Sequence, residues 1–165
     1  MPSASPIVNT SPLLYLHQVG RLDILTKLYG TVVTPAAVEQ ELAVGGTRGV
    51  DVPDLRLIDW LRIQPIESES TVPNVIDLGR GEAEVIALGR KTTDSLLIID
   101  DSLGRQVAAS YKLRCTGTLG VLIKAKQAGC IPTILPVISE LQEKGLWLTV
   151  PVIRQALKLA GEESN

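Results

Sequence analysis

The 165-residue chain has few of the side chains on which nucleophilic and redox enzymes depend. It contains one histidine, His17, and two cysteines, Cys115 and Cys130, which show neither CxxC spacing nor a nearby histidine. These counts disfavour a zinc site or a redox motif, and a protease would have to be built around His17 alone. The two cysteines are expected to be reduced, mostly buried thiols.

Aromatic residues and excess positive charge are also scarce. The sequence has no phenylalanine, two tryptophans and three tyrosines, so a stacking platform for single-stranded nucleic acid is disfavoured. A net charge of −2 and a pI of about 5.4 exclude a broad basic surface but allow a local basic rim. No apolar run approaches the roughly 18 residues of a membrane span. The N-terminus lacks a signal peptide pattern, so we expect a cytoplasmic protein without a membrane partner.

Strand-like and helix-like segments alternate along the chain. This alternation predicts a single-domain, three-layer α/β/α sandwich with a mainly parallel central sheet of about four or five strands. The domain is expected to span residues 6–160, between a disordered N-terminus at 1–5 and a frayed tail at 161–165. The predicted strands are 6–9, 31–34, 63–66, 96–100 and 114–116. The predicted helices are 12–19 (capped by Ser11), 22–29, 36–43, 55–61, 82–90, 102–111, 118–128, 134–143 and 152–160.

Clusters of polar residues follow the predicted strands, where an α/β sheet places its ligand-binding site. Asn9-Thr10-Ser11 and Asp100-Asp101 each close a strand-like run, and the segment 79–84 opens an apolar helix. Residues just past the C-terminal ends of parallel strands line the ligand crevice of an open α/β sheet. Carboxylates gathered there, with almost no His or Cys, favour hard divalent cations. The pattern therefore indicates metal-assisted phosphodiester chemistry.

Each candidate also has a structural interpretation. Asp101 and Asn9 can cap the helices that follow them, and acidic residues early in a helix offset its dipole. Glu82 and Glu84 are two residues apart and cannot share a helix face. Glu82 is favoured for the crevice, because Gly79 and Gly81 let the backbone approach closely.

Two further side chains leave alternatives open. Glu41 lies beside the core stripe of the helix opened by Pro35, and a solvated glutamate is the default interpretation there. Arg105 lies one helical turn after Asp101. It can pair with that carboxylate or contact a substrate phosphate.

Taken together, these stretches resemble the PIN domain family of small α/β nucleases with clustered acidic residues. The matching stretches are IVNTSPLL, TPAAVEQEL, LGRGEAEVIAL and LLIIDDSLGR. The order NTSP, GEAE, DDxxGR and GTLGVL, the last at residues 117–122, is similar to one PIN-like branch. The resemblance covers about residues 6–145. Typical active members carry Asp where this chain has Asn9, a difference that lowers the charge of the metal site.

The resemblance implies a metal-dependent endoribonuclease like the toxins of bacterial toxin–antitoxin pairs. Single-stranded RNA, an antitoxin protein and further copies of the chain in a homo-oligomer are the expected partners. The implied catalytic residues are Glu41, Glu82 and Asp101, and the Mg²⁺ or Mn²⁺ ligands are Asn9, Glu41, Glu82, Asp100 and Asp101. Arg105 and Arg80 are expected at a substrate phosphate, with Thr10, Ser11, Glu84 and Thr118 supporting the ligands.

Two other functions fit parts of the same pattern. A catalytically weak PIN-like module that binds RNA or a protein is favoured by Asn9 and the acidic pI. A phosphoacceptor receiver domain is suggested by the Asp100-Asp101 pair. That fold, however, would place its paired acids after the first strand, whereas this pair follows about a hundred residues.

Overall fold

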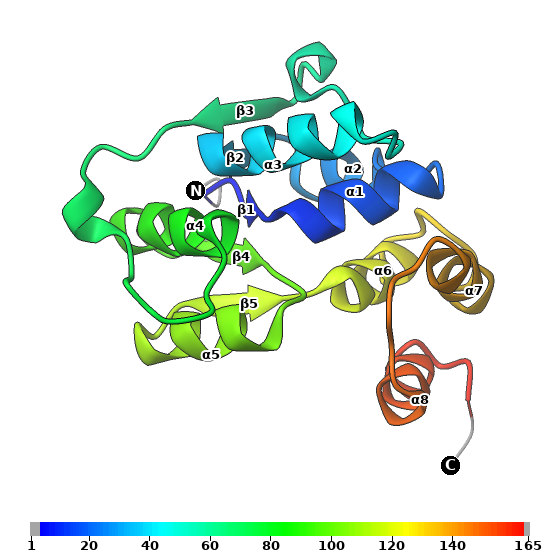
Figure 1. Cartoon of the computed structure of the whole chain (residues 1–165). Coiled ribbons are helices and arrows are strands. Elements are labelled where there is room, and N and C mark those ends of the chain that lie inside the picture. The colour runs from blue at the N-terminus through cyan, green and yellow to red at the C-terminus, as the bar shows by residue number, and fades with distance from the viewer. Residues whose placement is uncertain (1–3, 164–165) are drawn as a thin grey trace.

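The computed structural model describes residues 4–163, and the predictions for residues 1–3 and 164–165 lie outside them. One sheet of five parallel strands in the order β3-β2-β1-β4-β5 is flanked by helices (Figure 1). The strands are β1 Ile7–Val8, β2 Val32–Pro35, β3 Leu61–Gln64, β4 Leu96–Ile98 and β5 Arg114–Thr116. The α-helices are α1 Thr10–Gln18, α2 Ile24–Tyr29, α3 Ala36–Thr47, α4 Arg80–Lys91, α5 Ser102–Ser110, α6 Thr118–Gln127, α7 Leu135–Glu143 and α8 Val150–Leu159, with 3₁₀ turns η1 Leu55–Leu57 and η2 Glu69–Thr71. The predicted α/β/α fold with a parallel sheet is confirmed.

The middle of the sheet is formed by β1 and β4. Ile7 pairs with Leu97 and Val8 with Ile98, and all four side chains are at most 2% exposed. Strands covered on both faces read as continuous apolar runs, which explains why β4 was predictable from its sequence. Its predicted place inside the sheet is confirmed.

Three local predictions are wrong. The helix expected at 55–61 is only the 3₁₀ turn η1, and Leu61 begins the edge strand β3. Helix α3 does not stop at Gly45-Gly46 but continues to Thr47, because this end of the helix packs against Val52. Ser11 is not a helix cap, since α1 begins at Thr10 with Asn9 in the N-cap position.

The parallel sheet sets the position of the candidate residues. Because the strands run in one direction, the C-terminal ends of β1, β2 and β4 lie at the same edge of the sheet. Helices α1, α3 and α5 begin at this edge, and α4 contacts α3, α5 and these three strands. Segments far apart in the sequence therefore meet there. None of the helices in residues 4–163 has the length and hydropathy needed to cross a lipid bilayer.

The end of the described chain is held by one side chain. The Glu162 carboxylate accepts hydrogen bonds from the backbone N–H groups of Ile134 and Leu135 and from Lys126 Nζ. These contacts join the segment after α8 to the start of α7 and to α6.

Candidate metal centre

Asn9 is a buried amide at the end of β1. Its side chain is 2% exposed, and its Nδ2 donates a hydrogen bond of 2.9 Å to Glu82 Oε1. It makes no capping hydrogen bond to α1, so the capping interpretation of its side chain is wrong. Within residues 4–163, Asn9 Oδ1 is buried without any hydrogen-bond partner. A buried oxygen of this kind is costly unless something else satisfies it.

Glu41 lies on α3 with its carboxylate directed at the start of α4. Oε1 accepts the Gly81 N–H at 2.9 Å, and Oε2 accepts the Thr10 hydroxyl. A Cβ on Gly81 would stand 2.8 Å from both Glu41 oxygens and 3.0 Å from Asn9 Oδ1. The Glu41 carboxylate and Asn9 Oδ1 thus both lie against Gly81. Any other residue at this position would place its Cβ too close to them.

Glu82 and Asp101 both lie close to Gly104 in the first turn of α5. A Cβ on Gly104 would lie 3.1 Å from Glu82 Cγ and 3.4 Å from Asp101 Oδ2. Asp101 also caps α5, because its Oδ2 accepts the Gly104 N–H at 2.7 Å, as the structural interpretation predicted. Asp101 remains exposed, so this cap leaves the carboxylate open to a ligand.

Asp100 is held on the other side of the same edge. Its Oδ1 accepts the Thr118 N–H at 2.7 Å, and its Oδ2 accepts the hydroxyls of Thr118 at 2.7 Å and Ser11 at 3.1 Å. Asp100 therefore caps α6 from the loop after β4. Thr10, Ser11 and Thr118 each donate a hydroxyl hydrogen bond to one of the acidic residues.

Glu84 and Arg80 form a separate contact behind Glu41. Glu84 is 6% exposed, and its carboxylate accepts the Ala37 N–H of α3 at 3.1 Å and Arg80 Nε at 2.6 Å. Arg80 also pairs with Glu69, and hydrogen bonds from Glu69 and Glu84 raise the pKa of its guanidinium. This network fixes the start of α3, the helix that carries Glu41.

Arg105 does not pair with Asp101. It is exposed, and none of the ion pairs found in the described residues involves it. Its Nη1 lies near Gly117, 3.5 Å from the position a Cβ would take there, and Asp100 Oδ1 lies 2.8 Å from the same position. Unlike Arg80, Arg105 thus carries a charge that no carboxylate engages in an ion pair within the described residues.

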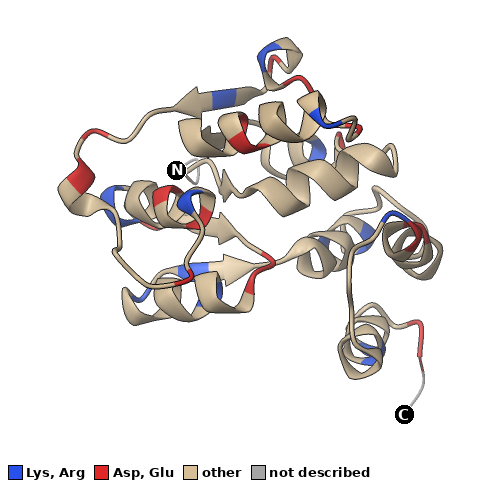
Figure 2. Cartoon of the chain, in the orientation of Figure 1, with Lys and Arg blue, Asp and Glu red and all other residues tan. Residues whose placement is uncertain are grey.

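The structure brings fewer of the predicted oxygen donors together than the sequence predicted. Figure 2 shows acidic segments on α3, on α4 and in the connection after β4. No group of three or more His, Cys, Asp or Glu side chains within residues 4–163 is spaced to hold a metal ion. Asn9 is not in that class, however: its Oδ1 lies with the Glu41 carboxylate beside Gly81, and its Nδ2 contacts Glu82. Oxygen donors of this kind suit Mg²⁺ or Mn²⁺.

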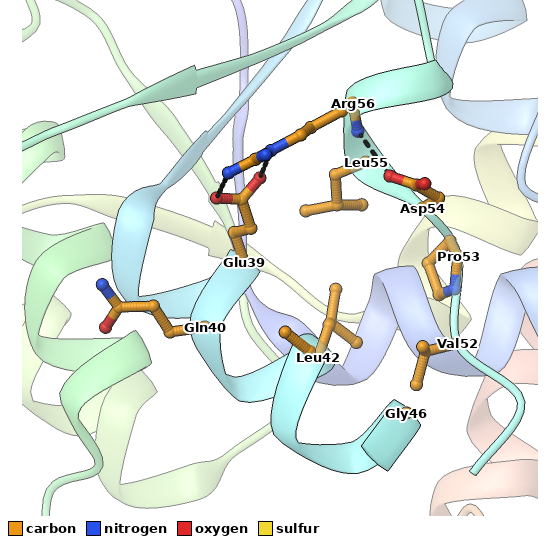
Figure 3. Close-up of a pocket in the computed structure, with 10 residues that line it drawn as sticks. Glu39, Gln40, Leu42, Gly46, Val52, Pro53, Asp54, Leu55 and Arg56 are labelled. Carbon is orange, nitrogen blue, oxygen red and sulfur yellow. Dashed lines mark hydrogen bonds and ion pairs between the residues drawn. The ribbon is translucent and has the colours of Figure 1, made fainter. Parts of the chain in front are cut away.

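A cavity of about 590 Å³ lies away from these residues, between α3 and the segment around η1 (Figure 3). Glu39 faces it and pairs with Arg56 Nε at 3.2 Å, and Asp54 caps the turn at Arg56. Glu39 and Glu41 are two residues apart on α3 and serve different sides of the helix. Glu39 is therefore a natural comparison for Glu41.

Comparison with known proteins identifies the family of the chain. No curated protein and no solved structure matches the chain. The model of one family, DUF3368, described as a PIN domain, matches residues 5–162. That match covers nearly the whole chain, including every candidate residue from Asn9 to Thr118. The chain belongs to the PIN domain family, whose fold is of the nuclease type.

Proposed function

We propose that the protein is a metal-dependent endoribonuclease that cleaves single-stranded RNA. The observation that carries the proposal is the buried, unpartnered Asn9 Oδ1, which shares a glycine-lined point with the Glu41 carboxylate. A bound cation would satisfy this oxygen, which accepts no hydrogen bond. Family membership supports the nuclease class, and the oxygen atoms around Gly81 support a metal site at this edge of the sheet.

The residues have distinct proposed roles. Asn9, Glu41 and Glu82 hold one Mg²⁺ or Mn²⁺ ion, and Asp101 reaches the same region from α5. When bound, such an ion lowers the pKa of a coordinated water and neutralises charge on the scissile phosphate. Asp100 positions the start of α6, while Arg105 binds a phosphate of the strand. Because Arg80 is paired with two carboxylates, its proposed part is to hold Glu84 and α3.

A role as the toxin of a toxin–antitoxin pair, acting as a homo-oligomer, extends the same proposal and rests on family resemblance. The competing function is a catalytically weak module that binds RNA or protein. Its specific support is Asn9, which stands in place of one carboxylate and leaves Glu41 beside the unpartnered oxygen and Glu82 at the amide nitrogen. A single bound ion is consistent with either function, whereas cleavage is consistent only with the first.

The test is cleavage of single-stranded RNA in Mn²⁺ or Mg²⁺, compared with excess chelator. Glu41→Gln should abolish cleavage, and Glu39→Gln, on the same helix but paired with Arg56, should leave it intact. Equilibrium Mn²⁺ binding should follow the same order. Cleavage that persists in chelator refutes the metal mechanism. Mn²⁺ binding by the parent without any cleavage would favour the binding module.

A further inference from the structure

A second cavity of about 590 Å³ is lined in part by Asp100, at the edge of the sheet where β4 ends. Asp100, Ser102 and Arg105 form one end of it, and the remainder extends between α6, α8 and the connection that leads to α8. Figure 1 shows α8 beside α6 and away from the sheet, and these two helices are in contact. We call this cavity the α6–α8 groove. It includes Asp100 and Arg105 from the predicted site residues, unlike the cavity at Glu39.

The walls of the α6–α8 groove are mainly apolar. Leu119 and Ile123 of α6 face Val152 and Leu159 of α8 across it, and Trp147 lies on the connecting segment. Trp147 is 82% exposed and Leu159 is 59% exposed. Small-ligand sites have this size and this mixture of apolar walls with a few polar groups. The groove therefore suits a flat, largely apolar ring.

The charge at the mouth of the groove is that of Arg105. Its guanidinium has no ion-pair partner among the described residues and lies beside Gly117. Burial raises the pKa of the Cys115 thiol on the groove wall, and the nearby Arg105 charge opposes that rise. Asp100, the acidic residue at this end, is committed to Thr118 and Ser11. The Arg105 guanidinium is thus available to bind an anion at this end of the groove.

We propose that the α6–α8 groove binds an unpaired nucleobase of the RNA strand, next to the phosphate held by Arg105. The proposal rests on the proposed ribonuclease function and names a contact with its substrate. An aromatic ring accepts any base through its π-face, so Trp147 contributes affinity without strict sequence preference. Only unpaired bases can enter such a groove, which gives the protein a physical means of selecting single strands.

The experiment compares two probes in excess chelator, so that no cleavage occurs. One is a short dye-labelled oligoribonucleotide, and the other is the same sugar–phosphate strand without bases. Trp147→Ala should weaken binding of the base-bearing strand roughly tenfold and leave binding of the abasic strand unchanged. Arg105→Ala should weaken both and reduce the salt dependence of binding. Leu57→Ala, which removes a side chain that is also 82% exposed, is the matched control and should change neither.

The outcomes separate the groove from the cleavage chemistry. Equal effects of Trp147→Ala on both strands, or no effect on either, overturn the nucleobase proposal even if the parent cleaves RNA. A base-dependent loss of affinity supports it even if no cleavage is found, in which case the ribonuclease proposal fails alone. A change in oligomeric state in Trp147→Ala, with both strands bound as by the parent, identifies the groove as an interface between copies and overturns the proposal.

Discussion

Asn9 Nδ2 lies 2.9 Å from Glu82 Oε1, so an amide joins the end of β1 to the first turn of α4. Typical active members of the family have a carboxylate at this position, and two carboxylates at this separation would repel each other. The amide removes that repulsion by donating a proton. It also turns Oδ1 toward the point bordered by Glu41 and Gly81.

Asn9→Asp should therefore lower the stability of the metal-free protein and raise its affinity for metal. Without metal, repulsion between the introduced carboxylate and Glu82 should cost about 1–3 kcal/mol, or a fall in Tm of roughly 2–4 °C per kcal/mol for a chain of this size. Mn²⁺ should bind more tightly than to the parent and restore Tm, because the added charge favours a cation. Calorimetric titration and thermal unfolding measure both effects. Mn²⁺ affinity equal to that of the parent would show that residue 9 does not face the ion.

Gly81→Ala should displace Glu41 while leaving the carboxylate in the chain. The new methyl group would stand 2.8 Å from both Glu41 oxygens, which is closer than van der Waals contact permits. Mn²⁺ affinity should fall at least tenfold. Gly45→Ala is the matched control in α3, since its Cβ would meet Val52 Cγ1 at an ordinary 3.6 Å and should alter neither affinity nor fold. Wild-type affinity in Gly81→Ala would place the ion elsewhere.

Asp101→Asn separates helix capping from metal chemistry. Asparagine caps helices about as well as aspartate, so the Tm should change by no more than about 1–2 °C. RNA cleavage in Mn²⁺ should nevertheless be lost, because one charge near the ion is removed. Asp100→Asn provides the contrast, since Asp100 accepts three hydrogen bonds and its loss should cost about 1–3 kcal/mol. If Asp101→Asn cleaved RNA as fast as the parent, the only role of Asp101 would be to cap α5.

The Glu162 contacts predict a loss of stability in acid. Burial opposes ionisation, but hydrogen bonds from Ile134, Lys126 and Leu135 prevail and lower the pKa of Glu162. A lowered folded-state pKa means that the stabilisation is present above the usual glutamate pKa and is lost as the pH falls through the folded value. Glu162→Gln should therefore lower the Tm at neutral pH and flatten its decline in acid. Glu163→Gln, which removes only a 3.9 Å contact with Arg154, should behave like the parent.

Much of the architecture could be predicted because it depends on local pattern. The apolar run of β4 and the polar residues at the ends of β1 and β4 are visible in the sequence, and parallel strands bring those ends to one edge. The spacing of Leu55, Ile58 and Leu61 imitates a helix, however. Pairing of Leu61 with Val32 across the sheet edge outweighs that local preference.

The contacts within the site could not be predicted in the same way. Asn9 and Glu82 are 73 residues apart, and no periodicity shows which oxygen will receive the amide proton. The hydrogen bond from the Ala37 N–H to Glu84 joins residues 47 apart, and no sequence pattern indicates it either. Trp147 belongs to a connection, so its place in the same groove as Arg105 depends on how α8 returns to α6.

Helices α3 and α4 exchange hydrogen bonds in both directions. Glu41 of α3 accepts an N–H of α4 at Gly81, and Glu84 of α4 accepts an N–H of α3 at Ala37. Each helix thus satisfies a donor at the other's first turn, so neither can slide without breaking both bonds. The Glu41 carboxylate is consequently held at a fixed place relative to the first turn of α4, which also carries Glu82. A change that breaks these two hydrogen bonds should therefore abolish cation binding altogether, instead of lowering the affinity gradually.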